Sequence, residues 1–531
     1  MTSMTSYYIG VDIGTTSTKA VVFGKKSEPV TASYFSYSLH SPTAHISEQN
    51  PNEIFFAVKN SIKQAVKNCL DSGTIRDNSQ IALIAFSCAM HSILAVDSAG
   101  DPLTNSITWA DRRAYNWALN VPNKQEIYQR TGAFVNAASP FCKLLWLKSE
   151  YPKIFEQAHK FISIKEYVFY RLFGEYVVDY SIAGASGLFN MSTLNWDTEV
   201  LKIIGITPDK LSKIVPTTTI MGKITANNAQ DMGINANTPV VIGANDGTLS
   251  NLGVNAISSD VVAVTIGTSA AIRTVLPQPF TGPPVGRAGP PAERVGSKAR
   301  TFCYPLTTEH WVIGGALNGA GVALRWFCDN FCELEQQAAA TSGDPLDVYK
   351  ILAEKAEKVA VGADGLLFHP SLPGERNPLK AVNMRGSFWG LGLHHTKSHM
   401  IRAILEGVIF NLCTILPVIE EIIDQSQTTK IAQIKATGGF ARSFLWRQIM
   451  ADILGKKIIV PQSFESSCLG AVVLGQYATG EITTITAVAN MIGTTHQHTP
   501  IPENFAKYQK ILPVYLRLYE VFLEEYSKID F

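Results

Sequence analysis

The sequence predicts an α/β protein built from two similar halves that face each other across a cleft. Two glycine turns carry this prediction: one runs from Asp12 to Lys19, and a similar one lies about half a chain later, from Val261 to Ile272. Each turn joins two strand-like apolar segments. A third observation is the run of alternating strand and helix segments after residue 430, which is typical of α/β folds.

Both turns combine glycine with threonine and serine. Glycine permits positive φ and a close approach of the backbone, and its neighbours supply amide and hydroxyl donors, so the turns suit a phosphate. A plain β-hairpin is the alternative for either turn taken alone. Asp12 has no acidic counterpart at the matching Thr265, which indicates that the two halves have diverged.

The composition indicates a globular protein with a small-molecule partner. A length of 531 residues predicts two or more domains, and 46% hydrophobic with 17% charged residues is enough for their cores. The net charge of +1 favours neither nucleic acid nor an anionic membrane. No apolar run approaches the roughly 20 residues of a membrane helix. The polar N-terminus lacks the features of a secretory signal, so we expect a cytoplasmic protein.

The cysteines and histidines show no zinc motif. Eight cysteines are scattered along the chain without paired Cys-x-x-Cys motifs, and the eleven histidines form no His-Glu-x-x-His motif. We therefore expect reduced, mostly buried thiols, and any metal ion should be held by oxygen.

In the first half, a helix is expected from the Asn50 cap to about Leu70. A buried strand from Ile81 to Phe86 then delivers Met90 and His91 at its carboxyl end. Ligands gather at this end of strands in α/β folds, so the loop is a candidate substrate wall. A histidine packed in the core is the alternative.

An aromatic residue, an acid and two cations stand within five residues, from Trp109 to Arg113. This density is typical of a recognition loop. Trp109 can cover the apolar side of a sugar, while Asp111 and Arg112 can bind its hydroxyl groups in bidentate fashion. A capped helix start with an ion pair is the alternative.

Amphipathic segments are expected from Pro140 to Glu150 and from Ile162 to Leu172, followed by a loop of small residues at 183–187. The buried strand from Val240 to Gly243 ends just before Asp246. An acid at this end of a strand suits a domain cleft. Capping of the next helix is the alternative, and one residue could serve both roles.

The second half contains a Pro/Gly/Arg-rich segment from Leu276 to Arg300, interpreted as a mobile surface insertion of undetermined role because strand-like sequence resumes after it. Glu375 and Arg376 are expected to form a structural pair. A long helix from about Ser398 carries apolar residues at helical spacing, and Pro417 should kink or break it.

A strand from Ile431 to Thr437 leads into Gly438-Gly439, and a helix follows from Phe444 to Leu454. A second strand and helix are expected at 457–461 and 468–477. A glycine turn at a helix N-terminus is a common nucleotide site. Joined to the two earlier turns, it indicates an ATP site.

Four of these motifs stand in the order seen in the FGGY carbohydrate kinases, relatives of actin, hexokinase and the heat-shock chaperone ATPase domain. They are Asp12 to Ser17, Gly243 to Gly247, Thr265 to Ser269 and Thr437 to Gly439. Two longer stretches resemble the two family signatures: Pro140 to Leu147, and Gly386 to Leu391 with His399 to Glu406. The resemblance covers nearly the whole chain.

Within the family, the chain is most similar to members that phosphorylate gluconate, through residues 87–92, 108–113, 164–167 and 436–443. It departs from them in the long insertion, in Gly184 where a serine is common, and in Lys380 where an aromatic residue is often found. A kinase for another sugar such as xylulose is the alternative. An actin-type or chaperone-type ATPase without a sugar substrate is a second one.

The resemblance implies two ribonuclease-H-like domains, residues 1–250 and 251–531, with ATP in the cleft between them. It implies ATP-dependent phosphorylation of D-gluconate at the C6 hydroxyl to give 6-phosphogluconate, by in-line transfer with Asp246 as the general base. Asp12 would hold Mg²⁺ through water.

The resemblance also assigns the binding residues. ATP and its phosphates would be held by Gly14, Thr15, Thr16, Gly267, Thr268, Gly438, Gly439 and Ser443. The substrate would be held by Met90, His91, Trp109, Asp111, Arg112 and Asp246, with Lys165 as a weaker candidate. Arg112 or Arg113 is the expected partner of a substrate carboxylate. The sequence does not decide the oligomeric state, and a homodimer is one option.

Overall fold

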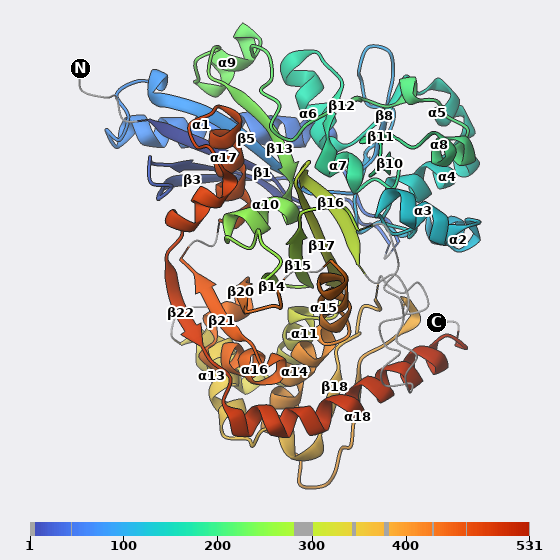
Figure 1. Cartoon of the computed structure of the whole chain (residues 1–531), viewed down its shortest axis with the longest axis vertical. Coiled ribbons are helices and arrows are strands. Elements are labelled where there is room, and N and C mark those ends of the chain that lie inside the picture. The colour runs from blue at the N-terminus through green and yellow to red at the C-terminus, as the bar shows by residue number, and fades with distance from the viewer. Residues whose placement is uncertain are drawn as a thin grey trace.

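Two mixed β-sheets, each accompanied by helices, form the two halves of the molecule (Figure 1). The computed structural model describes residues 6–43, 45–280, 301–341, 347–375, 382–426, 429–462 and 465–529. The expected insertion from Leu276 to Arg300 lies mostly outside the described residues. Arg376 and Lys380 also lie outside them, and so does the predicted pair of Glu375 with Arg376.

The first sheet has the strand order β13-β5-β1-β2-β3. β1, β2 and β3 are antiparallel neighbours, whereas β5 and β13 run parallel to β1. The strands are β1 (Tyr7–Ile13), β2 (Ser17–Phe23), β3 (Pro29–Ser36), β5 (Ile81–Cys88) and β13 (Val240–Asn245).

The second sheet repeats this plan with the order β16-β17-β15-β14-β20-β21-β22. β14, β15 and β17 are antiparallel neighbours, and β20 and β21 continue the sheet parallel to β14. The strands are β14 (Val261–Ile266), β15 (Ala270–Leu276), β16 (Phe302–Thr307), β17 (His310–Leu317), β20 (Gln433–Thr437), β21 (Lys457–Pro461) and β22 (Thr494–His498). Three antiparallel strands followed by two parallel strands occur in both halves, which confirms the predicted duplication.

Helices and short ribbons complete the first half. α1 (Pro51–Asp71) starts at the Asn50 cap, as predicted. The others are α2 (Tyr115–Asn120), α3 (Lys124–Thr131), α4 (Pro140–Glu150), α5 (Pro152–Gln157), α6 (Ile164–Phe173), α7 (Tyr180–Gly184), α8 (Thr198–Ile204), α9 (Ala226–Met232) and α10 (Asp246–Gly253). The paired short strands are β4 (Glu48–Gln49) with β7 (Ser106–Ile107), β6 (Leu94–Val96) with β8 (Lys160–Ile162), β9 (Val177–Asp179) with β12 (Lys213–Val215), and β10 (Phe189–Asn190) with β11 (Asn195–Trp196).

The predicted loop of small residues at 183–187 is partly helical. The carboxylate of Asp179 accepts hydrogen bonds from the backbone N–H groups of Ser181 and Ile182, and this cap starts α7. The sequence did not predict this helix, because five residues are too few to show a helical period.

The second half carries α11 (Gly321–Phe331), α12 (Glu333–Ala340), α13 (Asp347–Glu357), α14 (Lys397–Leu412), α15 (Leu416–Gln425), α16 (Phe444–Leu454), α17 (Ser466–Ala478) and α18 (Pro502–Tyr526), with the paired strands β18 (Leu367–His369) and β19 (Ser387–Trp389). The predicted break lies between α14 and α15, where Pro417 falls in the first turn of the new helix. Together, α14 and α15 form a segment from Lys397 to Gln425 that is long and apolar enough to cross a membrane. However, 89% of its most apolar 18-residue stretch is buried inside the protein, as in a core helix.

Both faces of the first sheet are covered. Ile9 and Val11 pack with α1 in one hydrophobic cluster, whereas Tyr8 points to the opposite face and joins a cluster with residues of α10 and α17. α17 therefore returns from the second half onto the first sheet, where Figure 1 shows it beside β5. An ion pair between Lys19 and Glu465 adds to this junction between the halves.

Candidate active site

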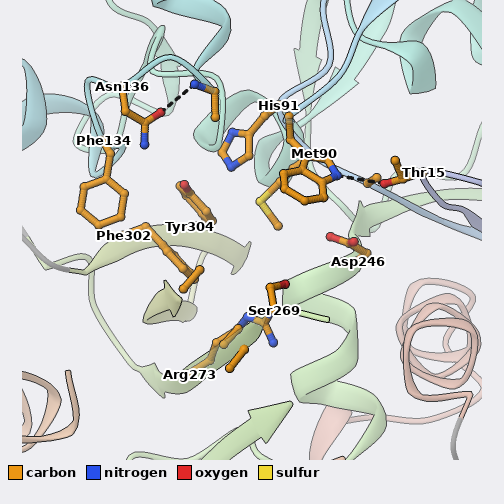
Figure 2. A pocket seen from close by; sticks show the side chains of 16 residues that line it. Thr15, Met90, His91, Phe134, Asn136, Asp246, Ser269, Arg273, Phe302 and Tyr304 are labelled. Atoms are coloured by element: carbon orange, nitrogen blue, oxygen red, sulfur yellow. Dashed lines mark hydrogen bonds between the residues drawn. The ribbon is translucent and has the colours of Figure 1, made fainter. Parts of the chain in front are cut away.

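A cavity of about 260 Å³ lies between the two halves (Figure 2). The first half supplies Thr15, Ala89, Met90, His91, Trp109, Phe134, Asn136, Ala138 and Asp246 to its lining. The second half supplies Ser269, Ala270, Ala271, Arg273, Phe302, Tyr304 and Ala316. The cavity thus combines one carboxylate, one arginine and several aromatic rings, a lining that suits a small polar ligand.

His91 is held in a strained backbone conformation at the end of the β5 loop. Its φ is +69°, in the left-handed region that non-glycine residues rarely adopt. Its Nδ1 donates to the Ala185 carbonyl over 2.8 Å, because that oxygen can only accept. A neutral imidazole bonded in this way presents Nε2 as an acceptor, which suits a substrate hydroxyl.

A buried lysine fixes the two loops that the sequence assigns to the substrate. Lys143 Nζ donates to the carbonyl oxygens of His91 at 2.6 Å and Thr108 at 2.7 Å. Burial lowers the pKa of Lys143 to about 7, with the nearby Asp111 acting in the opposite direction. One side chain of the first signature stretch therefore holds both the His91 loop and the start of the Trp109 loop.

Asp246 reaches the cavity because β13 is irregular just before it. The pairing of β13 with β5 shifts register between Val241 and Ala244. Gly243 lies in this irregularity with φ +71°, and a Cβ atom there would come within 1.8 Å of the Phe86 carbonyl oxygen. Asn245, not Asp246, caps α10, since its Oδ1 accepts from the N–H of Thr248. The capping alternative for Asp246 is therefore wrong.

The Asp246 carboxyl has a pKa raised to about 6. Burial is the largest cause, and the neighbouring carboxyl of Asp12 adds to it, while the positive charge of Arg273 acts in the opposite direction. Asp12 itself is half-buried and accepts a hydrogen bond from Ser87 Oγ at 2.7 Å; its loss of water also raises its pKa. Two acids thus lie near enough for their charges to interact, and one of them, Asp246, lines the cavity.

The second half repeats the Asp12 arrangement with neutral groups. Asp12 is paired in register with Ser87, and Thr265 is paired in register with Thr437. The two threonine hydroxyls are 2.9 Å apart, in place of the Ser87–Asp12 hydrogen bond. The absence of an acid at Thr265, noticed in the sequence, thus makes the first turn the acidic one of the pair.

The second turn is supported by the N-terminus of a helix that the sequence predicts at about residues 323–331, but the contact between them was not predicted. The backbone N–H groups of Gly321 and Val322 donate to the carbonyls of Gly267 and Thr268, at 3.0 and 3.1 Å. α11 therefore begins against this turn. The run Asn318-Gly319-Ala320-Gly321 was the available sequence signal, because glycine-rich segments commonly precede helix N-termini that bind phosphate.

The third glycine segment lies on the neighbouring strand. β20 pairs with β14 up to Thr437, so Gly438 and Gly439 follow directly at the end where the second turn lies. Ser443 caps α16, with its Oγ accepting from the N–H of Trp446. The residues predicted to hold ATP are thus placed at the ends of β1, β14 and β20.

Two predicted substrate residues are not among those that line the cavity. Asp111 is buried, and its carboxylate accepts from the N–H of Ser47 at 2.9 Å and from Arg113. Arg113 also pairs with Glu48, so the ion pair of the alternative interpretation is present. Arg112 is exposed and donates to the Pro373 carbonyl over 3.2 Å.

Lys165 is also outside the cavity lining, in a buried ion pair. Its Nζ lies 2.7 Å from Asp179 Oδ2, and both side chains are almost completely buried. It also donates to the Ala244 carbonyl at 3.3 Å, close to the end of β13. Lys165 thus supports the end of β13, the strand that leads into Asp246.

Several lining residues had no candidate role in the sequence: Phe134, Asn136, Arg273, Phe302 and Tyr304. Ser269, in contrast, belongs to the second predicted phosphate turn. Arg273 offered a signal, since it is a lone charge in the apolar segment from Ala270 to Leu276. Phe302 and Tyr304 offered none, because only the pairing of β16 with β17 brings their stacked rings to the cavity.

Comparison with known proteins identifies the family. Models of the N-terminal and C-terminal domains of the FGGY family of carbohydrate kinases match residues 7–253 and 262–479. The chain is 48% identical over 529 residues to a gluconokinase from Bacillus licheniformis, covering 99% of this chain and 98% of that protein. Its structure is similar to a gluconate kinase from Lactobacillus acidophilus (TM-score 0.88) and to a ligand-bound xylulose kinase from the same organism (TM-score 0.87). Each is 34% identical and covers 99% of this chain and 100% of its own. The chain therefore belongs to the FGGY family of carbohydrate kinases.

Proposed function

We propose that the protein transfers the γ-phosphoryl group of ATP to the C6 hydroxyl of D-gluconate, which gives 6-phosphogluconate. The observation that carries the proposal is the position of Asp246, which lines the cavity together with Thr15 and Ser269 of the two phosphate-type turns and lies near enough to Asp12 for their charges to interact. The identity of 48% to a gluconokinase over nearly the whole chain supports gluconate as the acceptor.

Asp246 acts as the general base in this proposal. It accepts the proton of the C6 hydroxyl while that oxygen attacks the γ-phosphorus in line with the leaving oxygen. A pKa of about 6 leaves the carboxylate mostly ionised at neutral pH and keeps it basic enough to accept a proton. Such a base typically contributes a factor of about 10² to 10⁴ to the rate.

The glycine segments hold the nucleotide. Phosphoryl transfer depends on alignment and charge neutralisation more than on covalent chemistry of the protein. We assign the phosphates to Gly14, Thr15 and Thr16 of the first turn and to Gly267 and Thr268 of the second. The adenosine lies against Gly438 and Gly439, with Ser443 at the helix start nearby.

Asp12 fits a role in holding Mg²⁺ through water. Within the described part of the chain, no group of three or more His, Cys, Asp or Glu residues forms a metal site. A single half-buried carboxylate beside the phosphate turn, with a second acid nearby, suits an ion that keeps most of its water. The ion would neutralise charge on the phosphate oxygens. Asp12 would hold the ion through its bound water, and the Ser87 hydroxyl orients the Asp12 carboxylate.

The substrate lies along His91, Met90 and Trp109. The tryptophan ring covers the carbon chain, and His91 accepts from a hydroxyl group. The assignment of Asp111 and Arg112 to the substrate stays a prediction, and neither residue lines the cavity. Domain closure is expected to bring the halves together and to exclude water that would compete for the phosphoryl group.

A panel of acceptors tests the proposal. ADP production is measured in a coupled assay with ATP and, in turn, D-gluconate, D-xylulose, glycerol or no acceptor. We expect gluconate to give the highest kcat/KM and the acceptor-free rate to be negligible. A preference for xylulose would establish the second candidate, which the similarity to a xylulose kinase structure favours. Hydrolysis of ATP without stimulation by any acceptor would establish an ATPase instead.

Three further proposals follow from the family. The domain boundary is proposed near residue 250, which agrees with family models that end at 253 and resume at 262. The protein is proposed to work in the cytoplasm, where its nucleotide substrate is made. A homodimer stays a prediction, and light scattering after size-exclusion chromatography checks it.

A further inference from the structure

Arg273 is the only lysine or arginine among the residues that line the cavity. It lies on β15, in the second half, and Figure 2 shows it on the side of the cavity opposite His91. Its side chain is partly exposed. Within the described parts of the chain, its guanidinium makes no hydrogen bond or ion pair, although the charge of Asp246 acts on it.

The fold makes room for this side chain. Gly314 on β17 is paired in register with Arg273. A Cβ atom at Gly314 would come within 2.9 Å of Arg273 Cγ and within 2.3 Å of the Ile272 carbonyl oxygen, which is too close for a side chain. The stem of the arginine therefore passes over a glycine of the neighbouring strand and carries the guanidinium into the cavity.

Holding a cation at this position costs free energy as long as no acceptor forms hydrogen bonds with it. Burial lowers the pKa of Arg273, which is the direction expected when a charge loses its water. A guanidinium has five N–H donors, and its fork matches two parallel acceptor oxygens. The site is thus electrostatically and geometrically prepared for an anion that arrives with the ligand.

Two anions could meet it: a phosphate of the nucleotide, or a carboxylate of the acceptor. Of the two phosphate turns, Thr15 and Ser269 reach the lining of the cavity, but Gly14, Thr16, Gly267 and Thr268 do not. The acceptor loops contribute more to it, through Met90, His91 and Trp109. Arg273 therefore shares a cavity with the acceptor loops. The two arginines first considered are placed differently, since Arg113 is paired with Asp111 and Glu48 and Arg112 is outside the lining.

We propose that Arg273 binds the carboxylate of an aldonate substrate in bidentate fashion and makes the enzyme selective for acids over neutral sugars. The inference rests on the proposed function. The two ends of the substrate then meet opposite charges: the terminal hydroxyl lies at Asp246, and the carboxylate lies at Arg273. Neutral polyols would leave the guanidinium without an acceptor, which is a penalty that rejects them.

The test compares D-gluconate with D-gluconamide, which keeps every hydroxyl group and lacks the charge. Arg273→Gln is expected to lower kcat/KM for gluconate about 10- to 100-fold, mainly through KM, because charge-assisted hydrogen bonds are lost. For gluconamide we expect a change of less than about threefold, since no such bonds exist to lose. Arg273→Lys should recover part of the preference, because it restores the charge without the fork. Arg517→Gln, at an exposed position on α18, is the matched control.

Three results would overturn the inference. Equal losses in kcat on both acceptors would place Arg273 in phosphoryl transfer, and loss of the preference in Arg112→Gln but not in Arg273→Gln would place the carboxylate elsewhere. An unchanged Kd for gluconate in Arg273→Gln, measured by calorimetry on folded protein, would also remove it. If the wild-type enzyme does not phosphorylate gluconate, the proposed function is wrong as well. If it phosphorylates gluconate, only the role assigned to Arg273 is wrong.

Discussion

The indole Nε1 of Trp109 donates a hydrogen bond to Thr15 Oγ1 over 2.9 Å, and this contact joins the loop proposed to bind the sugar to the first turn proposed to bind phosphate (Figure 2). Both residues also line the cavity. The two loops are thereby held as one unit. If they bind the two substrates as proposed, a change in either loop should disturb the binding of both.

Trp109→Phe keeps a ring at the cavity and removes the donor. We expect KM for gluconate to rise about 2- to 10-fold, because a neutral hydrogen bond is worth about 0.5 to 1.5 kcal/mol. Thr15→Val should be coupled to it, so that the double variant loses less kcat/KM than the two single losses combined. Trp196→Phe is the matched control, since its Nε1 donates to the Ser212 carbonyl outside this cavity. Independent, multiplicative losses would refute the coupling.

Asp246→Asn removes the proposed base with little change in shape. The variant should fold and bind ATP, and its kcat should fall about 10²- to 10⁴-fold. Steady-state kinetics and calorimetric titration with a nucleotide measure the two effects. Full turnover in this variant would contradict the mechanism.

The pH profile gives a second test of Asp246. Its pKa is raised to about 6, and only the ionised form accepts a proton. For the wild-type enzyme, kcat/KM should therefore be constant above about pH 7 and fall tenfold per pH unit well below pH 6. Since the charge of Arg273 lowers this pKa, Arg273→Gln should move the acid limb to higher pH. An acid limb near pH 4 would show that Asp246 is not the base.

Lys143→Met removes the cation that ties the His91 and Thr108 carbonyls together. We expect a higher KM for gluconate and a lower thermal midpoint, because each buried carbonyl left without a donor costs about 1 to 3 kcal/mol. Lys148→Met on the same helix is the control, since Lys148 Nζ donates to the Ile204 carbonyl outside the cavity. This control should lower the midpoint with KM unchanged. Equal KM effects in both variants would mean that Lys143 only stabilises the fold.

Glu166→Gln tests the linkage between a buried acid and stability. Burial raises the pKa of Glu166 to about 7, so the folded state binds this proton more tightly than the unfolded state. Its contribution to stability is present at low pH and is lost as pH rises toward 7. The variant should therefore gain stability relative to wild type between pH 5 and pH 8, by up to about 3 kcal/mol. Thermal melts at both pH values measure the gain, with Glu199→Gln at an exposed position as the control.

Local patterns were enough to predict much of the site. The turns at Gly14 and Gly267, the strand that ends before His91 and the acid after β13 are all continuous in the chain. Strand, turn and helix signals act over a few residues, so their positions follow from the sequence. The duplication followed from the similarity of two such local signals.

The placement of side chains that depend on distant partners could not be predicted in this way. Asp111 stands in a motif typical of recognition, yet the backbone N–H of Ser47 and the side chain of Arg113 hold its carboxylate inside the protein. Phe302 reaches the cavity only because β16 pairs with β17. Neither placement leaves a periodic signal in the sequence. Ser47 is remote from Asp111 in the chain, and the pairing of two strands sets the direction of the Phe302 side chain.

The sequence by itself determined the α/β class, the two phosphate-type turns, the family and the acid at Asp246, because each depends on short continuous motifs. The tertiary structure alone decided which charges face the cavity. It brought Arg273 to the cavity over Gly314 and left Arg112 outside the lining, since strand register and the packing of the two halves, not local sequence, determine where a side chain points.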